Sequence, residues 1–139
     1  ANTITLTTDI DVASYVARNY YGGISAEATL QDIYIAVRFT LPINFGSWAA
    51  TDAIKIEFFT GSADSDDSHV DIYIYKSGSG SLVASSEDNV YVKNWAEAVI
   101  DNSDLGDWAA NDIIEIFLKL ESKDSNFARI GKITFNYTA

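Results

Sequence analysis

His69 is the only histidine in the chain, so acid–base or nucleophilic catalysis would have to be built on it. No Gly-x-Ser-x-Gly sequence supplies a nucleophile, no cysteine can join the histidine in a transition-metal site, and there is no glycine-rich phosphate loop. Carboxylates are plentiful, but they cluster in polar segments and on the polar sides of alternating segments. We therefore interpret His69 as a solvated residue at the start of a strand, and we expect a protein that is not an enzyme.

Three aspartates in one short segment, Asp64, Asp66 and Asp67, are the candidate metal ligands. Carboxylate oxygens are the ligands that Ca²⁺ prefers, and a second polar cluster follows at 101–104. The EF-hand pattern is absent, because neither its glycine nor its bidentate glutamate stands at the required distance from Asp64. Calcium is thus the one cofactor that the residue types leave open, and the alternative is a solvated acidic turn.

The charge balance argues against anionic partners. Twenty Asp and Glu residues against nine Lys and Arg residues give a net charge of −11, which repels phosphate backbones and anionic lipid. No apolar run approaches the roughly 18 residues that a membrane-spanning helix needs. We expect neither nucleic acid nor a membrane as a partner.

Alternation of apolar and polar residues with a period of two dominates the chain and predicts β-strands. The expected strong strands cover 32–39, 54–58, 70–75, 114–121 and 128–137, and weaker ones cover 3–8, 81–85, 90–93 and 96–100. The last strand breaks phase at Gly131, where a β-bulge would return Ile133 and Phe135 to the core side. We expect turns at 20–23 and 78–81, because each contains two glycines.

A sequence repeat relates two parts of the chain, 46–75 and 106–137, and each part begins with Gly-x-Trp-Ala-Ala-x-Asp. The residues shared at equivalent positions are Gly46 and Gly106, Trp48 and Trp108, and Asp52 and Asp112. Glycine permits a tight turn, tryptophan can close one end of a sandwich with its indole N–H bonded to a loop carbonyl, and aspartate ends the turn. We expect these six residues to be structural anchors of two hairpins related by a pseudo-twofold axis.

These patterns predict an all-β fold, in which 1–139 is a single domain built as a two-sheet antiparallel β-sandwich of the jelly-roll type. A chain of 139 residues can bury a core of its own without the help of cysteines. The segment 1–30 is the most ambiguous part, and we interpret it as a strand or arm used in packing or assembly.

Several aromatic residues fall on the polar sides of the predicted strands. Tyr73 and Tyr75 alternate with the core positions of their strand, and Phe59 and Phe117 do so in theirs. An apolar outer face of this kind is normally covered. Three covers stay open: the segment 9–30, a neighbouring subunit, or the flat ring of a sugar.

The threonine-rich start at 2–8, the two Gly-x-Trp-Ala-Ala-x-Asp segments and the run at 128–133 give the chain a likeness to one class of proteins. In composition and predicted architecture it resembles small jelly-roll structural proteins of bacteriophage and viral particles, of the decoration, fibre or minor capsid type. The resemblance implies a virion protein that associates with copies of itself and other particle proteins, and that contacts a host-surface glycan.

The strand predicted at 3–8 is short and apolar on one side, so it could add to the edge of a neighbouring sheet. We therefore expect Ile4 and Leu6, together with Tyr73 and Tyr75, to form the interface of such an assembly. Two other functions stay open. One is a carbohydrate-binding or lectin-like sandwich module, which the tyrosines and the acidic loops favour, and the other is an extracellular filament subunit assembled by strand exchange.

Overall fold

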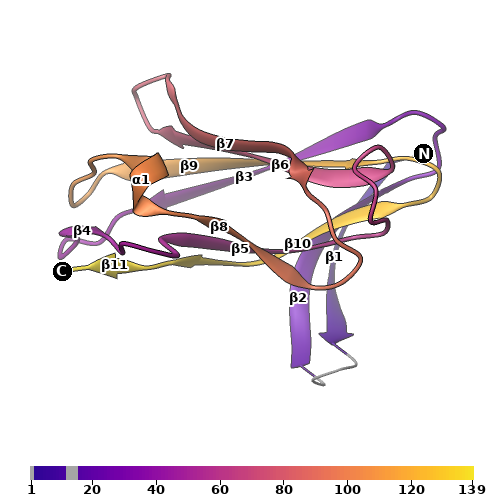
Figure 1. The fold of residues 1–139 in the computed structure, drawn as a ribbon, viewed down its shortest axis with the longest axis horizontal. Helices are drawn as coiled ribbons and strands as arrows, with labels where there is room; N and C mark the ends of the chain where they lie inside the picture. The colour runs from indigo at the N-terminus through magenta and orange to yellow at the C-terminus, as the bar shows by residue number, and fades with distance from the viewer. Residues whose placement is uncertain (1, 12–15) are drawn as a thin grey trace.

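The computed structural model describes residues 2–11 and 16–139, with side chains described at 20–87 and 90–139. In this part of the chain two antiparallel sheets face each other (Figure 1). One sheet has five strands in the order β1-β2-β10-β5-β8, the other has four in the order β3-β9-β6-β7, and β4 and β11 form a short additional pair. The prediction of an all-β, two-sheet antiparallel sandwich is confirmed.

The strands of the five-stranded sheet are β1 (Asn2–Asp11), β2 (Val16–Ser25), β10 (Phe127–Phe135), β5 (Ile54–Thr60) and β8 (Ala96–Ile100). Those of the four-stranded sheet are β3 (Gln31–Thr40), β9 (Ile113–Ser122), β6 (Ser68–Lys76) and β7 (Leu82–Val90). The remaining elements are β4 (Ser47–Trp48), β11 (Tyr137–Thr138) and the single helical turn α1 (Asn102–Leu105). No helix among the described residues is both long and apolar enough to cross a membrane.

The core lies between the two sheets and consists of the apolar residues of the alternating segments. In β5 the buried residues Ile54, Ile56 and Phe58 alternate with half-buried ones, and Ile114 and Ile116 do the same in β9. Burying each such side chain stabilises the fold by about 1.5–3 kcal/mol relative to leaving it exposed. The period of two therefore determines which face of each sheet meets the other.

The two copies of the sequence repeat form units that cross between the sheets. In the first copy β5 lies in the five-stranded sheet and β6 in the four-stranded sheet, whereas in the second copy β9 and β10 lie the other way round. β5 pairs with β10 and β6 pairs with β9, so each strand pairs with a strand of the other copy. This exchange is what a pseudo-twofold axis produces. The expectation of two hairpins was wrong, because the loop inside each copy passes from one sheet to the other.

Trp48 and Trp108 meet at one end of the core, with ring centroids 6.0 Å apart and ring planes at 76°. Both side chains are buried. The indole N–H of Trp108 donates a hydrogen bond to the carbonyl oxygen of Leu105, at 2.7 Å. Nε1 of Trp48 has no hydrogen-bond partner among the described residues. The loop-carbonyl contact expected of both tryptophans is thus present for one of them.

The glycines and aspartates at equivalent repeat positions have different roles. A Cβ on Gly46 would lie 2.8 Å from the backbone of the last residue, whereas Gly106 takes a φ of 71°, which favours glycine. The carboxylate of Asp112 accepts the backbone N–H three residues before it, at 2.9 Å. Asp52 instead has a φ of 53°, and its N–H donates to the carboxylate of Asp101 at 2.8 Å.

The register of β10 against β5 shifts around Gly131, so the expected β-bulge is confirmed. A Cβ on Gly131 would lie 3.2 Å from both the Trp95 ring and the Cβ of Glu57, so the glycine also allows the indole to pack closely. Beyond the bulge, Ile133 and Phe135 pack against the core.

The N-terminal strands form a hairpin at the edge of the five-stranded sheet. β2 pairs with β10 only through 21–24, and the far end of the hairpin extends away from the sandwich (Figure 1). The predicted turn at 20–23 was wrong, because these residues continue β2. Ile4 and Leu6 lie on β1, the edge strand, and their side chains are outside the described residues. The strand predicted at 90–93 is also wrong beyond its first residue, where β7 ends.

Candidate functional site

The outer face of the four-stranded sheet carries a row of aromatic side chains. Phe117 of β9 lies directly opposite Tyr73 of β6, Tyr75 follows two residues later on the same side of β6, and β3 adds Tyr34. Tyr34 is 59% exposed and the other three are half-buried. Of the segment 9–30, the end of β1 and the whole of β2 lie in the opposite sheet, so these strand residues do not cover this face. We call these four residues the aromatic face.

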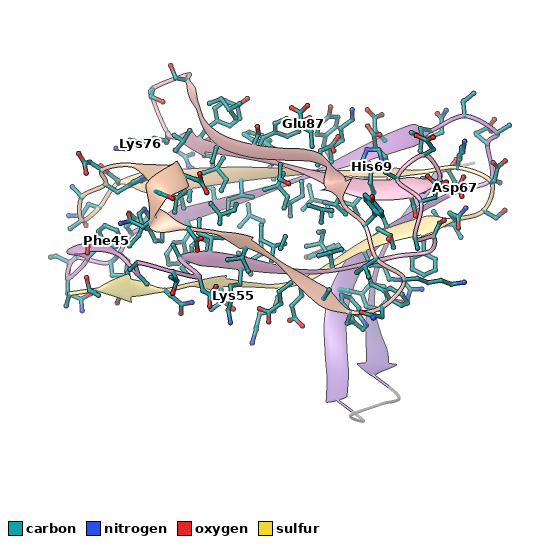
Figure 2. All side chains as sticks on the ribbon, viewed as in Figure 1. Phe45, Lys55, Asp67, His69, Lys76 and Glu87 are labelled. Atoms are coloured by element: carbon teal, nitrogen blue, oxygen red, sulfur yellow. The ribbon has the colours of Figure 1, made fainter. Side chains whose placement is uncertain are left out.

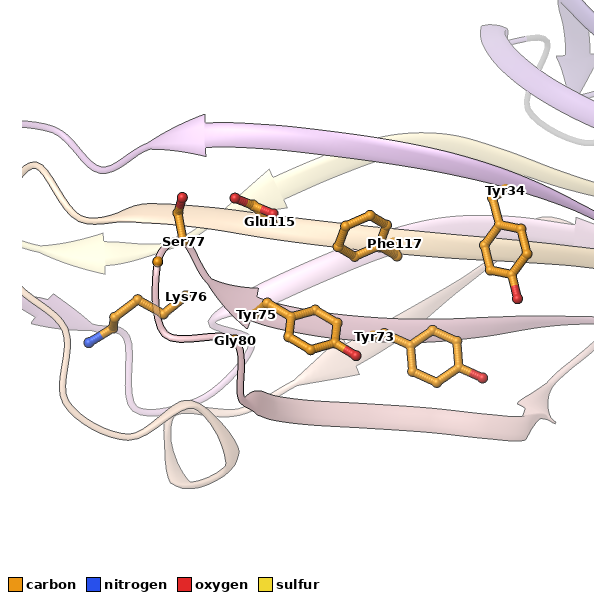
Figure 3. A pocket seen from close by; sticks show the side chains of 9 residues that line it. Tyr34, Tyr73, Tyr75, Lys76, Ser77, Gly80, Glu115 and Phe117 are labelled. Carbon is orange, nitrogen blue, oxygen red and sulfur yellow. The ribbon is translucent and has the colours of Figure 1, made fainter.

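A groove of about 730 Å³ lies over the aromatic face (Figure 3). One wall is the turn between β6 and β7, where Gly78 and Gly80 have positive φ angles of 85° and 66°, in agreement with the hairpin tip predicted there. The lining residues are Tyr34, Tyr73, Tyr75, Lys76, Ser77, Gly78, Gly80, Glu115 and Phe117. A groove of this size with aromatic walls and a few polar groups is typical of sites that bind small organic ligands.

The aromatic rings do not all lie in one plane. The ring centroids of Tyr75 and Phe117 are 5.6 Å apart and their planes are at 83°, an edge-to-face contact. Burial raises the pKa of the Tyr73 hydroxyl above its ordinary value, and the nearby negative charges of Asp71 and Glu87 raise this pKa further. The phenol therefore stays neutral at physiological pH and can donate a hydrogen bond to a ligand.

Two cationic side chains beside the groove are already paired with acidic groups. The Arg38 guanidinium donates to the hydroxyl of Ser77 at 3.1 Å and lies 3.9 Å from the carboxylate of Glu115. The Lys76 ammonium lies 3.4 Å from the carboxylate of Asp112. The positive charge beside the groove is therefore partly offset by the carboxylates of Glu115 and Asp112.

Beyond the aromatic face the same surface of the sheet carries four polar residues, which we call the polar cluster. His69 and Asp71 belong to β6, and Lys119 and Glu121 belong to β9 (Figure 2 labels His69). His69 is only 2% exposed, so the prediction of a solvated histidine was wrong. One contact is tertiary, because pairing of β6 with β9 places Glu121 directly opposite His69. The other is local, since the carbonyl oxygen of Ser65 in the preceding loop is 2.7 Å from Nδ1.

Charged contacts connect all members of the polar cluster. Nε2 of His69 lies 2.8 Å from a carboxylate oxygen of Glu121 and 3.5 Å from one of Asp71. The Lys119 ammonium bonds the other carboxylate oxygen of Glu121. This hydrogen bond raises the pKa of Lys119, although burial acts in the opposite direction. The sequence indicated none of this, because the four residues meet only when β6 and β9 pair.

The predicted calcium ligands Asp64, Asp66 and Asp67 belong to a turn that is held by its own hydrogen bonds. A carboxylate oxygen of Asp64 accepts the backbone N–H of Asp66 at 2.9 Å, and the carboxylate of Asp67 accepts the hydroxyl of Ser62 at 3.1 Å. The three aspartates do not form a convergent set of metal ligands among the described residues. The contacts are those of an acidic turn, the alternative that the sequence left open.

No family model matches the chain, and no curated protein matches it. Similar folds occur in solved structures. The carbohydrate-binding module TmCBM61, in complex with beta-1,4-galactotriose, has a TM-score of 0.54 and 13% identity, and the match covers 99% of this chain and 88% of that one. A chain of infectious bursal disease virus, Gx strain, has a TM-score of 0.32 and 15% identity, covering 92% of this chain and 35% of that one.

The first likeness shows the fold: this chain is a β-sandwich that resembles a carbohydrate-binding module over nearly its whole length. The second likeness is too distant to carry an argument. The expected virion role is therefore untested and stays a prediction.

Three members of the aromatic face were predicted from the sequence as outward-pointing aromatics, whereas the fourth, Tyr34, was not. A signal was available, since Tyr34 stands at a polar-side position in its alternating segment. Tyr34 joins Phe117 and Tyr73 because of the strand order β3-β9-β6. The alternation within a single strand does not predict this order.

Proposed function

We propose that this chain is a non-catalytic carbohydrate-binding domain that holds a neutral glycan in the groove over the aromatic face. The observation that carries the proposal is a set of four aromatic side chains on one sheet face, left uncovered by the described residues and lying beneath an open groove. The C–H faces of sugar rings pack against aromatic rings, and removing both surfaces from water is favourable. Tyrosine hydroxyls, Ser77 and Glu115 provide hydrogen-bond partners for sugar hydroxyls.

The charges around the groove favour a neutral glycan over an acidic one. The chain has a net charge of −11, and Arg38 and Lys76 are already paired with carboxylates. A uronic acid bound here would bring its carboxylate close to those acidic partners, and like charges brought together at a binding site weaken binding. Neutral sugars do not meet this cost.

The fold likeness to TmCBM61 supports the proposal at the level of architecture. The ligand in that structure, beta-1,4-galactotriose, is accordingly the first probe for this chain.

The test is isothermal titration calorimetry with β-1,4-galactotriose, followed by oligosaccharides of other neutral β-linked hexoses and pentoses. We expect one of these neutral probes to bind, and Tyr34→Ala and Tyr73→Ala each to weaken binding about tenfold, because aromatic side chains at the centre of an interface contribute about 1–2 kcal/mol. Tyr34 is the safer variant for folding, since it is already 59% exposed.

Tyr91→Ala is the matched control, because Tyr91 is also partly exposed and lies outside the groove. It should bind the probe as the unmodified chain does. The proposal fails if no neutral probe binds, or if Tyr34→Ala and Tyr73→Ala bind as tightly as the control.

A further inference from the structure

We propose that the polar cluster is a binding site for one divalent transition-metal ion, and that zinc is the ion its ligands fit best. His69, Asp71 and Glu121 supply the ligand atoms, one nitrogen and two carboxylate oxygens, which lie within 4.8 Å of one another. Within the described ranges this is the one group of three or more such side chains close enough to share an ion. The inference is independent of the glycan proposal, because none of the three residues lines the groove.

Strand pairing brings the three ligands together on a rigid surface. His69 and Glu121 stand directly opposite each other on β6 and β9, and Asp71 lies two residues along β6 on the same face. Opposite residues of antiparallel strands have Cα atoms about 4.5–5.5 Å apart, so their side chains meet without any help from a loop. All three residues are at most 9% exposed. Ligands on buried strands are held in position before the ion arrives.

The histidine ring is oriented as a metal ligand would be. Its Nδ1 lies 2.7 Å from the carbonyl oxygen of Ser65. A carbonyl oxygen can only accept, so Nδ1 carries the proton of this hydrogen bond, and Nε2 faces the two carboxylates. Metal-ligating histidines usually donate their second ring N–H to a carbonyl or carboxylate in this way, which fixes both tautomer and ring orientation.

The donor set selects the kind of metal. One imidazole nitrogen and two carboxylate oxygens are zinc ligands, and three protein ligands leave a fourth position open. Calcium takes about six to eight oxygen ligands, so this set of three with a nitrogen does not suit it.

The charges of the cluster also favour a cation. Asp71 and Glu121 place two carboxylates in a buried site, and Lys119 contributes one positive charge through the second oxygen of Glu121. Buried charges are stabilised by pairing or by coordinating a metal, so a divalent ion at this site would be attracted to both carboxylates.

The test is titration of the chelator-treated full chain with ZnCl₂. Binding is monitored by calorimetry and by the midpoint temperature of thermal unfolding. We expect one equivalent of Zn²⁺ to bind and to raise the midpoint, because an ion that binds only the folded state stabilises it. Asp71→Asn and Glu121→Gln each remove one ligand with little change of shape and should weaken Zn²⁺ binding at least tenfold. CoCl₂ should produce the visible absorption of a bound cobalt ion, and His69→Gln should abolish it.

Asp66→Asn is the matched control, since it removes an exposed carboxylate from the nearby acidic turn without touching the cluster. It should bind Zn²⁺ as the unmodified chain does. The inference is overturned if excess Zn²⁺ leaves the midpoint unchanged, or if Asp66→Asn weakens binding as much as Asp71→Asn. Should the cluster variants fail to fold, absence of a cobalt spectrum in the unmodified chain overturns it equally.

Discussion

Trp48 and Trp108 stand at equivalent positions of the repeat and pack against each other, yet their polar contacts differ. The indole of Trp108 donates to the carbonyl of Leu105, while Nε1 of Trp48 has no partner among the described residues. A buried polar group that loses its partner costs about 1–3 kcal/mol, so the same substitution should have different consequences at the two positions.

Replacing each tryptophan by phenylalanine tests this difference. We expect Trp108→Phe to lower the free energy of unfolding by about 1–2 kcal/mol more than Trp48→Phe, because only the former leaves a carbonyl without its donor. Both variants lose a similar apolar area, so each is the control of the other. Urea denaturation gives both values, and equal losses would mean that the indole hydrogen bond makes no net contribution.

At the level of single elements, the bulge in β10 affects both the core and the outer face of the five-stranded sheet. The extra residue at Gly131 returns Ile133 and Phe135 to the core, and its missing side chain leaves room for the ring of Trp95. The glycine therefore serves both the register of the strand and the packing of a loop against its outer face.

Gly131→Ala should destabilise the protein by about 1–3 kcal/mol, because the new Cβ would lie 3.2 Å from the Trp95 ring and the added volume would force a close contact to shift. In a Trp95→Ala background the same change should cost at least 0.5 kcal/mol less, as expected of two residues in contact. A double-mutant cycle measured by urea denaturation gives the coupling. An identical cost in both backgrounds would exclude the contact with Trp95 as the cause.

For the molecule as a whole, the net charge of −11 repels anionic polymers and does not affect the approach of neutral ones to the aromatic face. Exposed charges interact strongly at low ionic strength and weakly at high ionic strength, since salt screens them. A neutral glycan bound through ring stacking and hydrogen bonds is not subject to this dependence.

Affinity electrophoresis in gels that contain either β-1,4-galactan or polygalacturonate separates the two cases. We expect retardation by a neutral polymer only, with an affinity that changes less than about twofold between 50 and 500 mM NaCl. The gel without polymer and the Tyr34→Ala variant are the controls. Retardation by the acidic polymer that disappears with salt would contradict a neutral ligand.

Much of the architecture was predictable because it follows from the spacing of apolar and polar residues within short segments. Alternation around Ile54, Ile72 and Ile116 identified core strands, and the phase break at Gly131 identified the bulge. The segment at 20–23 was misassigned because its two glycines suggest a turn, whereas pairing with β1 and β10 keeps it extended.

The candidate site was predictable only in part, for a related reason. Outward aromatics such as Tyr73 could be recognised from their positions within a strand, but the groove also needs Tyr34, which comes from a strand two places away in the sheet. His69 was taken for a solvated residue, because nothing near it in sequence shows that strand pairing places Glu121 directly opposite its side chain.

Most of the strands, the face that each of them buries, the internal repeat and the net negative charge could be predicted from the sequence alone, because they follow from the spacing and charge of neighbouring residues. Three features depend on contacts between distant segments: the crossing of the two repeats between sheets, the aromatic face that the described residues leave uncovered, and the convergence of His69, Asp71 and Glu121. The physical reason is that strand order and loop placement are set by packing over the whole core, which no single segment encodes.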